Sequence, residues 1–157
     1  MDFIVENALN NAPEHDFENM SQANIKVIGV GGAGNNMVGW LYKKGIKGAE
    51  IIATNTDHQH LNITGADRKF LIGKDCTRGL GCGGFPSRGA EAAQESMTVV
   101  KDALKTSDMV FVCAGMGGGT GTGASPVVAQ VAKDTGAIVI GTVTMPFNIE
   151  RARCDKA

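Results

Sequence analysis

The chain has 157 residues, which is the length of one domain and leaves little room for a second hydrophobic core. Hydrophobic residues make up 43% and charged residues 20% of the chain, as in ordinary globular domains. The net charge of −1 provides no cationic surface for nucleic acid, so composition argues against nucleic acid as a partner.

Residues 1–23 are polar, contain Pro13 and include five acidic side chains, so we expect a loosely held N-terminal extension. The acidic start differs from the basic start of a secretory signal. No apolar run in the sequence approaches the roughly 20 residues that a membrane helix needs. These features predict a cytoplasmic protein without direct membrane insertion.

Regular structure is predicted to start with an apolar strand, "IKVIGV", at 25–30. After a first glycine loop, helical spacing with a glycine stop predicts a helix at 35–45. Two more strands are predicted at 49–57 and 68–73, followed by a long glycine loop at 79–89.

The second half continues the alternation. A long helix rich in alanine and glutamate is predicted at 87–106, a buried strand at 108–115 and a helix at 123–136. Residues 137–143 are predicted as another buried strand. The last ten residues, 148–157, begin like a helix without a stop, so we expect the chain to end inside an element. The pattern predicts an α/β fold, a Rossmann-like parallel sheet flanked by helices with ligands at the carboxyl ends of its strands.

The cysteines and histidines show neither a zinc-binding spacing nor a disulfide framework. The cysteines are widely separated, contain no C-x-x-C pair and have no neighbouring histidine; they are Cys76, Cys82, Cys113 and Cys154. We therefore expect free thiols and no metal site built from protein side chains.

The first glycine loop, "GVGGAG" at 29–34, fits the G-x-G-x-x-G pattern of dinucleotide-binding folds. Such a turn between a strand and a helix suits NAD and mononucleotides equally, because backbone amides and the helix end attract any phosphate. Asp57, at the end of the second strand, could bind an NAD ribose. It could equally cap the following helix. An NAD-binding oxidoreductase is therefore one alternative.

A second glycine loop, "AGMGGGTGTGASP" at 114–126, changes the interpretation. A plain connection would avoid so many glycines, because each adds to the entropy lost on ordering. Hydroxyls of Thr120 and Thr122 can join the loop amides in a concave anion site. Two helix N-termini that converge on one anion suit a di- or triphosphate. Neither loop contains a lysine, so we expect Mg²⁺ to help neutralise the phosphates.

Five motifs in order carry a family resemblance: "GVGGAGNN" (29–36), "NTD" (55–57), "RGLGCGGFPSRG" (78–89), "GGGTGTG" (117–123) and "MPF" (145–147). The chain resembles the FtsZ and tubulin GTPases over residues 24–153, and Thr122 is the FtsZ form of the signature, where tubulins usually carry serine. The resemblance implies a GTP-binding domain at 24–157 that stops before the central helix is complete, without the C-terminal domain.

The resemblance also implies which residues hold GTP or GDP. Backbone amides of the first loop would bind phosphates at Gly31, Gly32, Ala33, Gly34, Asn35 and Asn36. The signature loop would grip the α- and β-phosphates through Gly118, Gly119, Thr120, Gly121 and Thr122.

Further positions complete the implied nucleotide site. The loop at Gly81, Cys82, Gly83 and Gly84 would approach the γ-phosphate, although the family has Asn-Pro-Glu where this chain has residues 85–87, Phe-Pro-Ser. Glu150 would bind the ribose, although Arg151 and Cys154 stand where the family has glycine and arginine. Asp57 is kept as a nucleotide-binding candidate.

The implied function is that of a filament-forming cell-division GTPase which hydrolyses GTP at a head-to-tail interface. Its catalytic residues would come from an acidic loop of the neighbouring subunit, so none is assigned in this chain. The implied partners are further copies of itself and, through a C-terminal region, division-ring and membrane-adaptor proteins at midcell. Besides the oxidoreductase, a tubulin-like cytoskeletal GTPase outside division and a non-enzymatic filament-capping subunit remain alternatives.

Overall fold

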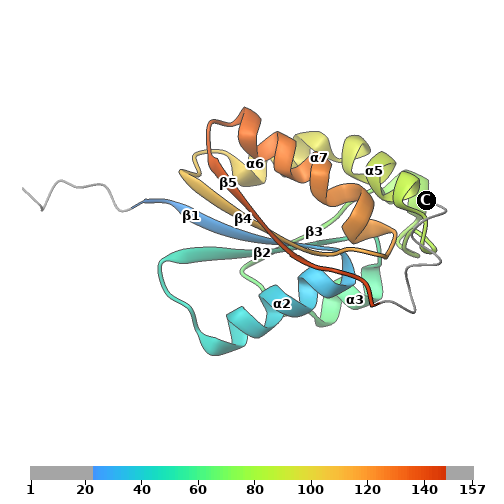
Figure 1. Ribbon diagram of the computed structural model, residues 1–157, viewed down its shortest axis with the longest axis horizontal. Helices are drawn as coiled ribbons and strands as arrows, with labels where there is room; N and C mark the ends of the chain where they lie inside the picture. The colour runs from blue at the N-terminus through green and yellow to red at the C-terminus, as the bar shows by residue number, and fades with distance from the viewer. Residues whose placement is uncertain (1–22, 148–157) are drawn as a thin grey trace, which may run out of the picture.

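Five parallel strands form one sheet (Figure 1). The computed structural model describes residues 23–147. The strands lie in the order β3-β2-β1-β4-β5 and span Ile25–Val30 (β1), Ala49–Asn55 (β2), Arg68–Leu71 (β3), Met109–Gly115 (β4) and Ile138–Thr144 (β5). The predicted α/β fold with a parallel sheet is confirmed.

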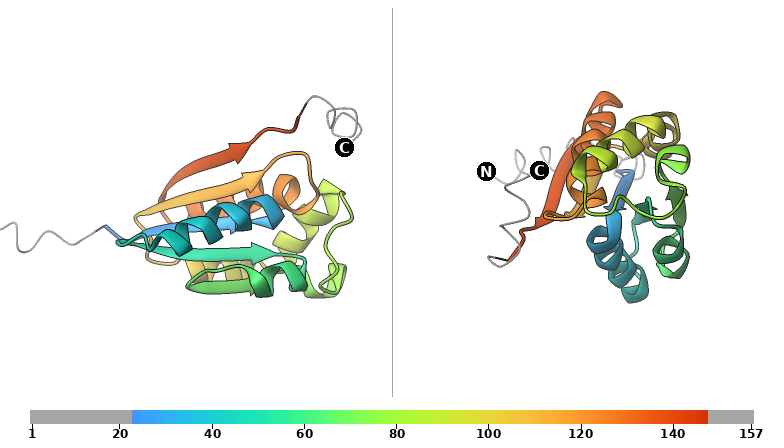
Figure 2. Two further views of the ribbon diagram at one scale, coloured as in Figure 1. Left: turned by 90° about the horizontal axis from the view of Figure 1, so that it is seen from below. Right: turned by 90° about the vertical axis from the view of Figure 1, so that its right-hand side faces the viewer.

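Helices cover both faces of this sheet (Figures 1 and 2). Helices α2 (Gly31–Lys44) and α3 (His58–Ile63) lie on one face. The opposite face carries α5 (Pro86–Glu95), α6 (Met97–Leu104) and α7 (Thr120–Asp134). A short turn of helix that the sequence did not predict, α4 (Lys74–Thr77), follows β3.

Alternation along β1 divides the core into two clusters. Ile28 is fully buried in the cluster beneath α6 and α7, whereas its neighbour Val27 belongs to the cluster beneath α2. Successive side chains of a strand point to opposite faces, so a continuous apolar run serves a sheet that is covered on both sides. This burial explains why the "IKVIGV" strand is apolar apart from Lys26, whose ammonium group pairs with the Glu50 carboxylate at 3.3 Å.

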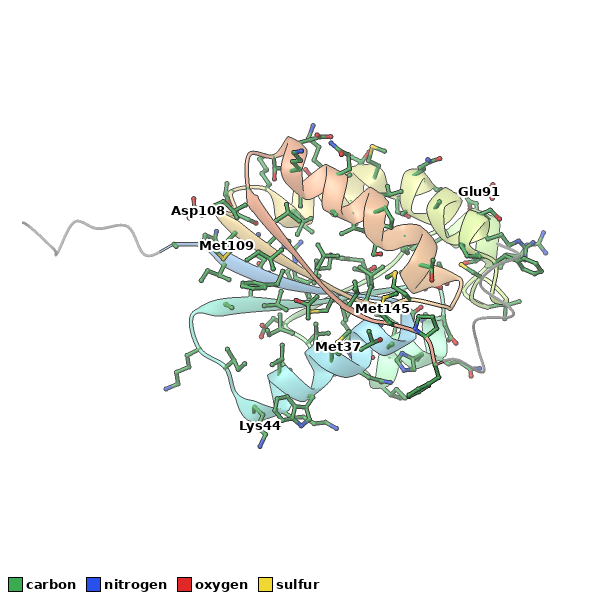
Figure 3. The ribbon with its side chains drawn as sticks, in the orientation of Figure 1. Met37, Lys44, Glu91, Asp108, Met109 and Met145 are labelled. Carbon is green, nitrogen blue, oxygen red and sulfur yellow. The ribbon has the colours of Figure 1, made fainter. Side chains whose placement is uncertain are left out.

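The strand order reverses between β1 and β4, because the chain continues to β2 on one side and reaches β4 on the other. Val30 at the end of β1 is in register with Ala114 near the end of β4, so the loops that follow both strands start at the same edge. Figure 3 shows this edge at Met145 and the opposite edge at Asp108 and Met109. Ligands of doubly wound sheets bind in the crevice at such a reversal.

The prediction of one helix over 87–106 was wrong. The segment forms α5 and α6, which meet at Ser96, where φ is −99° and ψ is 15°. The Ser96 hydroxyl accepts a hydrogen bond of 2.9 Å from the Gly73 backbone N–H, a buried donor on a distant segment. An unpaired buried N–H is costly, so this tertiary contact favours the break over a continuous helix.

Residues 137–143 were predicted as a buried strand. The strand is present as β5, but the prediction that it is buried was wrong. Within the described residues β5 pairs with β4 alone, and most of its side chains are exposed. Ile138 is 62% and Val143 is 49% exposed. An apolar run therefore identified the strand but not its position at the edge of the sheet.

Several predictions fall on residues 1–22 and 148–157, which lie outside the described residues. They are almost the whole N-terminal extension, the final helix start, Glu150 and Cys154. Among the helices of residues 23–147, none is both long and apolar enough to cross a membrane.

Candidate functional site

Two helices begin at the carboxyl ends of β1 and β4 without a side-chain cap. The N-cap of α2 is Val30 and that of α7 is Gly119, and neither N-terminus receives a side-chain hydrogen bond. The first amides of an α-helix have no partner within the helix and carry a partial positive charge. By contrast, α3 is capped, because the Asp57 carboxylate accepts a hydrogen bond of 3.0 Å from the His60 N–H. The uncapped pair is therefore available to an anion.

The two uncapped N-termini lie against each other. Gly31 opens α2 with φ of +73°, and a Cβ added there would lie 2.7 Å from the backbone nitrogen of Gly121 in the first turn of α7. A Cβ added at Gly121 would lie 2.5 Å from the carbonyl oxygen of Gly115. Both positions need glycine, because the neighbouring backbone leaves no room for a Cβ. Gly31 needs it also for its positive φ. The sequence thus brings two positive helix ends to one place.

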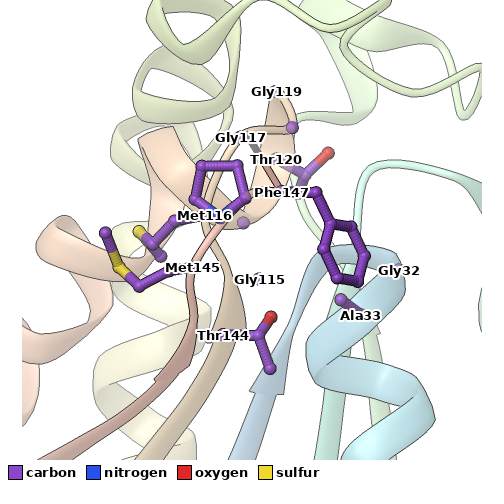
Figure 4. Close-up of a pocket in the computed structure, with 13 residues that line it drawn as sticks. Gly32, Ala33, Gly115, Met116, Gly117, Gly119, Thr120, Thr144, Met145 and Phe147 are labelled. Atoms are coloured by element: carbon purple, nitrogen blue, oxygen red, sulfur yellow. The ribbon is translucent and has the colours of Figure 1, made fainter. Parts of the chain in front are cut away.

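A hollow of about 600 Å³ opens at this junction (Figure 4). It is lined by Gly32 and Ala33 of α2, by residues 115–121 and by residues 144–147. Among the described residues, the lining side chains include no charged group, and the Thr120 and Thr144 hydroxyls supply polar atoms beside the backbone. The hollow can therefore attract an anion through amides and helix ends rather than through lysine or arginine.

The loop at 79–85 lies against the start of α7. A Cβ added at Gly119 would lie 2.8 Å from the Cβ of Cys82 and 3.1 Å from the carbonyl carbon of Gly84. The same loop is held to the end of β2, because the Gly81 N–H donates to the Thr56 carbonyl at 3.1 Å. Three loops that are distant in sequence therefore meet beside the hollow.

Side chains from these three segments form a compact hydrogen-bonded group. The Thr56 and Thr120 hydroxyl oxygens are 2.7 Å apart, and each is 3.4 Å from the Cys82 sulfur. Thr56 is fully buried and Cys82 is 3% exposed, while Thr120 also lines the hollow. The family resemblance placed both Thr120 and Cys82 beside the nucleotide, but the hydrogen bonds that join them to each other and to Thr56 were not predicted.

Six of the sequence-predicted site residues line the hollow: Gly32, Ala33, Gly118, Gly119, Thr120 and Gly121. Gly31 and Gly34 pack behind it against neighbouring backbone. The Thr122 hydroxyl accepts a hydrogen bond of 2.9 Å from the Gly117 N–H, so it holds the shape of the loop. Asp57 caps α3, as one sequence interpretation held.

Asn35 and Asn36 are not among the residues that line this hollow. Both line a smaller hollow of about 300 Å³ between α2 and α3. Asn35 is fully buried, and neither its amide nitrogen nor its amide oxygen has a hydrogen-bond partner within residues 23–147. A site of this size and polarity has room for water, which would satisfy both atoms.

Met116 and Thr144 also line the hollow, although neither was predicted as a site residue. Met116 lies inside the second glycine loop, and its N–H donates to the Thr144 carbonyl at 2.8 Å. This bond brings the end of β5 to the hollow, along with the "MPF" motif at 145–147 that carried part of the resemblance. Both residues reach the hollow because β5 lies beside β4, and this pairing could not be predicted from the sequence.

The three cysteines of the described residues are free thiols, as predicted. Burial, followed by a hydrogen bond to Glu95 and the negative charge of that side chain, raises the pKa of the Cys76 thiol to about 11. The Glu95 pKa is lowered, because its carboxylate accepts hydrogen bonds from the Asp75 and Cys76 N–H groups, each at 3.1 Å. The carboxylate thus stays charged beside the thiol and opposes its ionisation.

We predict slow alkylation of Cys76 in the folded chain. A shift from the ordinary value of 9.0 to about 11 lowers the thiolate fraction at pH 8 by about a hundredfold, and only thiolate reacts. Iodoacetamide labelling followed by peptide mass spectrometry should show this difference between folded and urea-unfolded chain. Glu95→Gln should restore part of the rate, and an unchanged rate in that variant would contradict the role given to Glu95.

Among residues 23–147, no group of three or more histidine, cysteine, aspartate or glutamate side chains is arranged to hold a metal ion.

Known proteins match this chain over nearly all of its length. The family model described as "Tubulin/FtsZ family, GTPase domain" matches residues 24–157. The chain is 57% identical over 140 residues to cell division protein FtsZ 2 of Methanocaldococcus jannaschii, covering 89% of this chain and 37% of that protein. FtsZ 2 of Haloferax volcanii is 56% identical over 133 residues, with 85% and 33% covered. The chain therefore spans well under half the length of these relatives.

Solved structures agree with the sequence matches. A structure titled "FtsZ dimer, empty (M. jannaschii)" superposes with a TM-score of 0.85 at 47% identity, covering 99% of this chain and 43% of that one. CetZ from Methanosaeta thermophila, at 24% identity and a TM-score of 0.67, shares the fold. The nicotinamide alternative gains no support from these matches. The described fold, the ordered glycine loops and the family match together show that this chain belongs to the Tubulin/FtsZ family through its GTPase domain.

Proposed function

We propose that this chain is the nucleotide-binding part of a filament-forming cell-division GTPase of the FtsZ type. The observation that carries the proposal is the meeting of two uncapped helix N-termini, at Gly31 and Thr120, over one hollow. Its lining within residues 23–147 contains no lysine or arginine. A nucleoside di- or triphosphate matches such a site, because its adjacent phosphates can use both helix ends.

The lining suits phosphate oxygens in chemistry and in space. The amides of Gly32, Ala33 and residues 118–121 supply donors, and the absence of side chains at the glycines lets phosphate approach the backbone. As far as residues 23–147 define it, the lining contains hydroxyls and no carboxylate, so Mg²⁺ would be held mainly by phosphate oxygens and water. Bound Mg²⁺ would neutralise phosphate charge.

The lining also bears on hydrolysis. None of the side chains around the described hollow can act as a general base, since they are glycine, alanine, methionine, threonine, proline and phenylalanine. Water activation in the filament would therefore come from an acidic loop of the next subunit. A heterologous head-to-tail contact of this kind extends into an open filament.

The remaining roles follow from the family. Glu150 would bind the ribose, and Asn36, Gly83 and Gly84 would complete the nucleotide contacts. Division-ring and membrane-adaptor proteins would bind regions outside this chain, at a ring at midcell in the cytoplasm. A tubulin-like role outside division is the second candidate; the FtsZ form of the signature at Thr122 and the identity to cell-division relatives favour division.

Trp40 provides the test of nucleotide binding. It lies on α2, and its side chain is 60% exposed. Along α2 it follows Gly31 by about two and a half turns of helix, at roughly 3.6 residues per turn. GTP and GDP should change its fluorescence with saturation, whereas NAD should not, and the chain alone should hydrolyse GTP slowly or not at all. Saturable NAD binding without a guanine-nucleotide response would overturn the proposal.

A sedimentation assay tests the filament role. The chain should not pellet as long filaments by itself with GTP. Added to a polymerising full-length FtsZ, the chain is expected to lower the pelleted fraction, because its nucleotide-binding surface would compete for contacts between subunits. Turnover of GTP by the isolated chain at the rate of a full-length relative would contradict the proposal that hydrolysis needs a second subunit.

A further inference from the structure

The smaller hollow, of about 300 Å³, lies between α2 and α3 on the face of the sheet opposite α5, α6 and α7 (Figure 1). We call it the α2–α3 hollow. Its lining includes Asn35, Gly39 and Lys43, which follow one line along α2 at a spacing of four residues. His60 of α3 lies across from them. Within residues 23–147 this hollow shares no lining residue with the proposed nucleotide site.

The α2–α3 hollow contains a polar side chain without a partner. Asn35 lines it and is fully buried, and within residues 23–147 neither its amide nitrogen nor its amide oxygen has a hydrogen-bond partner. A buried polar group that stays unpaired is costly. Water can pair with this amide, and a ligand that reproduces both hydrogen bonds can displace the water. Such a ligand must carry an acceptor for the NH₂ group and a donor for the oxygen.

His60 supplies a second donor, because its neighbours fix the position of the ring proton. The side-chain oxygen of Asn55 accepts hydrogen bonds from the backbone N–H groups of Thr56 at 2.9 Å and Asp57 at 3.3 Å. The NH₂ group of Asn55 therefore faces the His60 Nδ1, at 3.3 Å. Since an NH₂ group donates, Nδ1 accepts and the neutral ring carries its proton on Nε2. Among the described residues this Nε2–H has no acceptor, so it is available to a ligand.

Lys43 brings positive charge to the exposed side of the α2–α3 hollow. Within the described part of the chain it forms no ion pair, and the described lining contains no aspartate or glutamate. The neighbouring Lys44 does not belong to the lining and lies over the Trp40 ring, 5.1 Å from its centroid. Two N–H donors and an unpaired cation without a nearby acid favour an anion as the ligand.

Gly39 keeps the α2–α3 hollow open. It lies inside α2 without a positive φ, at a position where alanine would stabilise the helix. A Cβ there would lie 3.6 Å from the Thr64 Cγ2 and 3.8 Å from the Gly65 nitrogen, which are ordinary contacts. Close packing therefore does not require glycine at this position. The missing side chain leaves room between α2 and the turn after α3.

We propose that the α2–α3 hollow binds inorganic phosphate. Phosphate is an anion that keeps a P–OH group at neutral pH, so it can donate to the Asn35 oxygen. Its other oxygens accept from the Asn35 NH₂ group and the His60 Nε2–H, while Lys43 attracts it by charge. The inference does not rest on nucleotide binding. Phosphate is also the ion that the proposed GTP hydrolysis would release, so the full-length protein would meet this ligand as its own product.

NMR titration of the 157-residue chain at pH 8 tests the proposal at the atoms concerned. Phosphate should shift the side-chain NH₂ signals of Asn35 and the ring signals of His60 with saturation. Sulfate has the same shape without a P–OH group, so it should bind at least about tenfold more weakly, because the Asn35 oxygen would face another acceptor. Methyl phosphate has lost its P–OH group at this pH and should behave like sulfate.

Two outcomes of this titration would overturn the proposal. Equal binding of phosphate and sulfate would mean that the hollow attracts anions by charge alone. Saturable shifts confined to the amides of residues 118–121 would mean that phosphate binds at the proposed nucleotide site instead. Failure of GTP or GDP to bind would count against the proposed function and would leave the Asn35 and His60 shifts as expected.

Three variants assign the binding to individual side chains, with the His60 signals as the readout. Asn35→Leu replaces the amide by an apolar group of nearly the same shape and should lower phosphate affinity more than about tenfold. Lys43→Ala changes an exposed residue, so the chain should fold normally and lose about two- to fivefold in affinity. Lys44→Ala is the matched control and should keep the original affinity. Equal losses in the two lysine variants, or full affinity in a folded Asn35→Leu chain, would refute the assignment.

Discussion

Gly123→Ala is expected to destabilise the folded chain severely. Gly123 lies in the first turns of α7 where that helix crosses α5, and a Cβ there would run into the carbonyl oxygen of Pro86 and lie 2.7 Å from the backbone nitrogen of Ala90. Both obstacles are backbone atoms, so no side chain can rotate to make room. The helices would have to separate and loosen the core beneath them.

The expected loss is more than about 3 kcal/mol, at the upper end of the cost of overpacking a core. Because a domain of this size is stable by only about 5–15 kcal/mol, such a loss removes roughly a fifth to more than half of the free energy of unfolding. Urea unfolding followed by circular dichroism measures it as a lower midpoint at an unchanged slope.

Gly141→Ala is the matched control for this prediction. Gly141 lies in β5, and a Cβ built there meets nothing within 4 Å. The same added methyl should leave stability unchanged or raise it by up to about 1 kcal/mol, because glycine in a strand is unfavourable relative to alanine. A Gly123→Ala variant as stable as Gly141→Ala would show that α5 and α7 do not pack as closely as described.

The sheet could be predicted because the signals for its strands and turns lie within short stretches of sequence. A mostly apolar strand such as "IKVIGV" is needed wherever both faces are covered, and the glycines after β1 and β4 mark the ends where helices begin. The motifs also identified the hollow, since six of the predicted residues line it. These features depend on the residues themselves and on the alternation of elements along the chain.

What could not be predicted depends on contacts between distant segments. The break at Ser96 exists because the Gly73 N–H needs an acceptor, and the roles of Thr56 and Cys82 exist because three loops meet. The exposure of β5 depends on which strands neighbour it in the sheet. In each case the local pattern was compatible with two outcomes, and tertiary pairing decided between them.

Gly31→Ala is expected to abolish nucleotide binding while the sheet stays folded. Gly31 has φ of +73°, and its added Cβ would lie 2.7 Å from the Gly121 nitrogen, so α7 must move away from α2. Separation of the two helix ends would cost at least two amide–phosphate hydrogen bonds. At about 1.5–3 kcal/mol for each bond to a charged group, affinity for GTP and GDP should fall more than about a hundredfold.

Gly45→Ala separates this effect from the strain of positive φ. Gly45 ends α2 with φ of +68°, close to that of Gly31, but an added Cβ there meets nothing within 4 Å. This variant should lose about 1 kcal/mol of stability, as alanine in a left-handed conformation does, and keep full affinity. Nucleotide displacement measures the affinity of both variants, and urea unfolding measures their stability. Equal affinity losses in both would mean that strain in α2, rather than contact between the helix ends, controls the site. Loss confined to Gly31→Ala would mean that the phosphates bind where α2 and α7 touch.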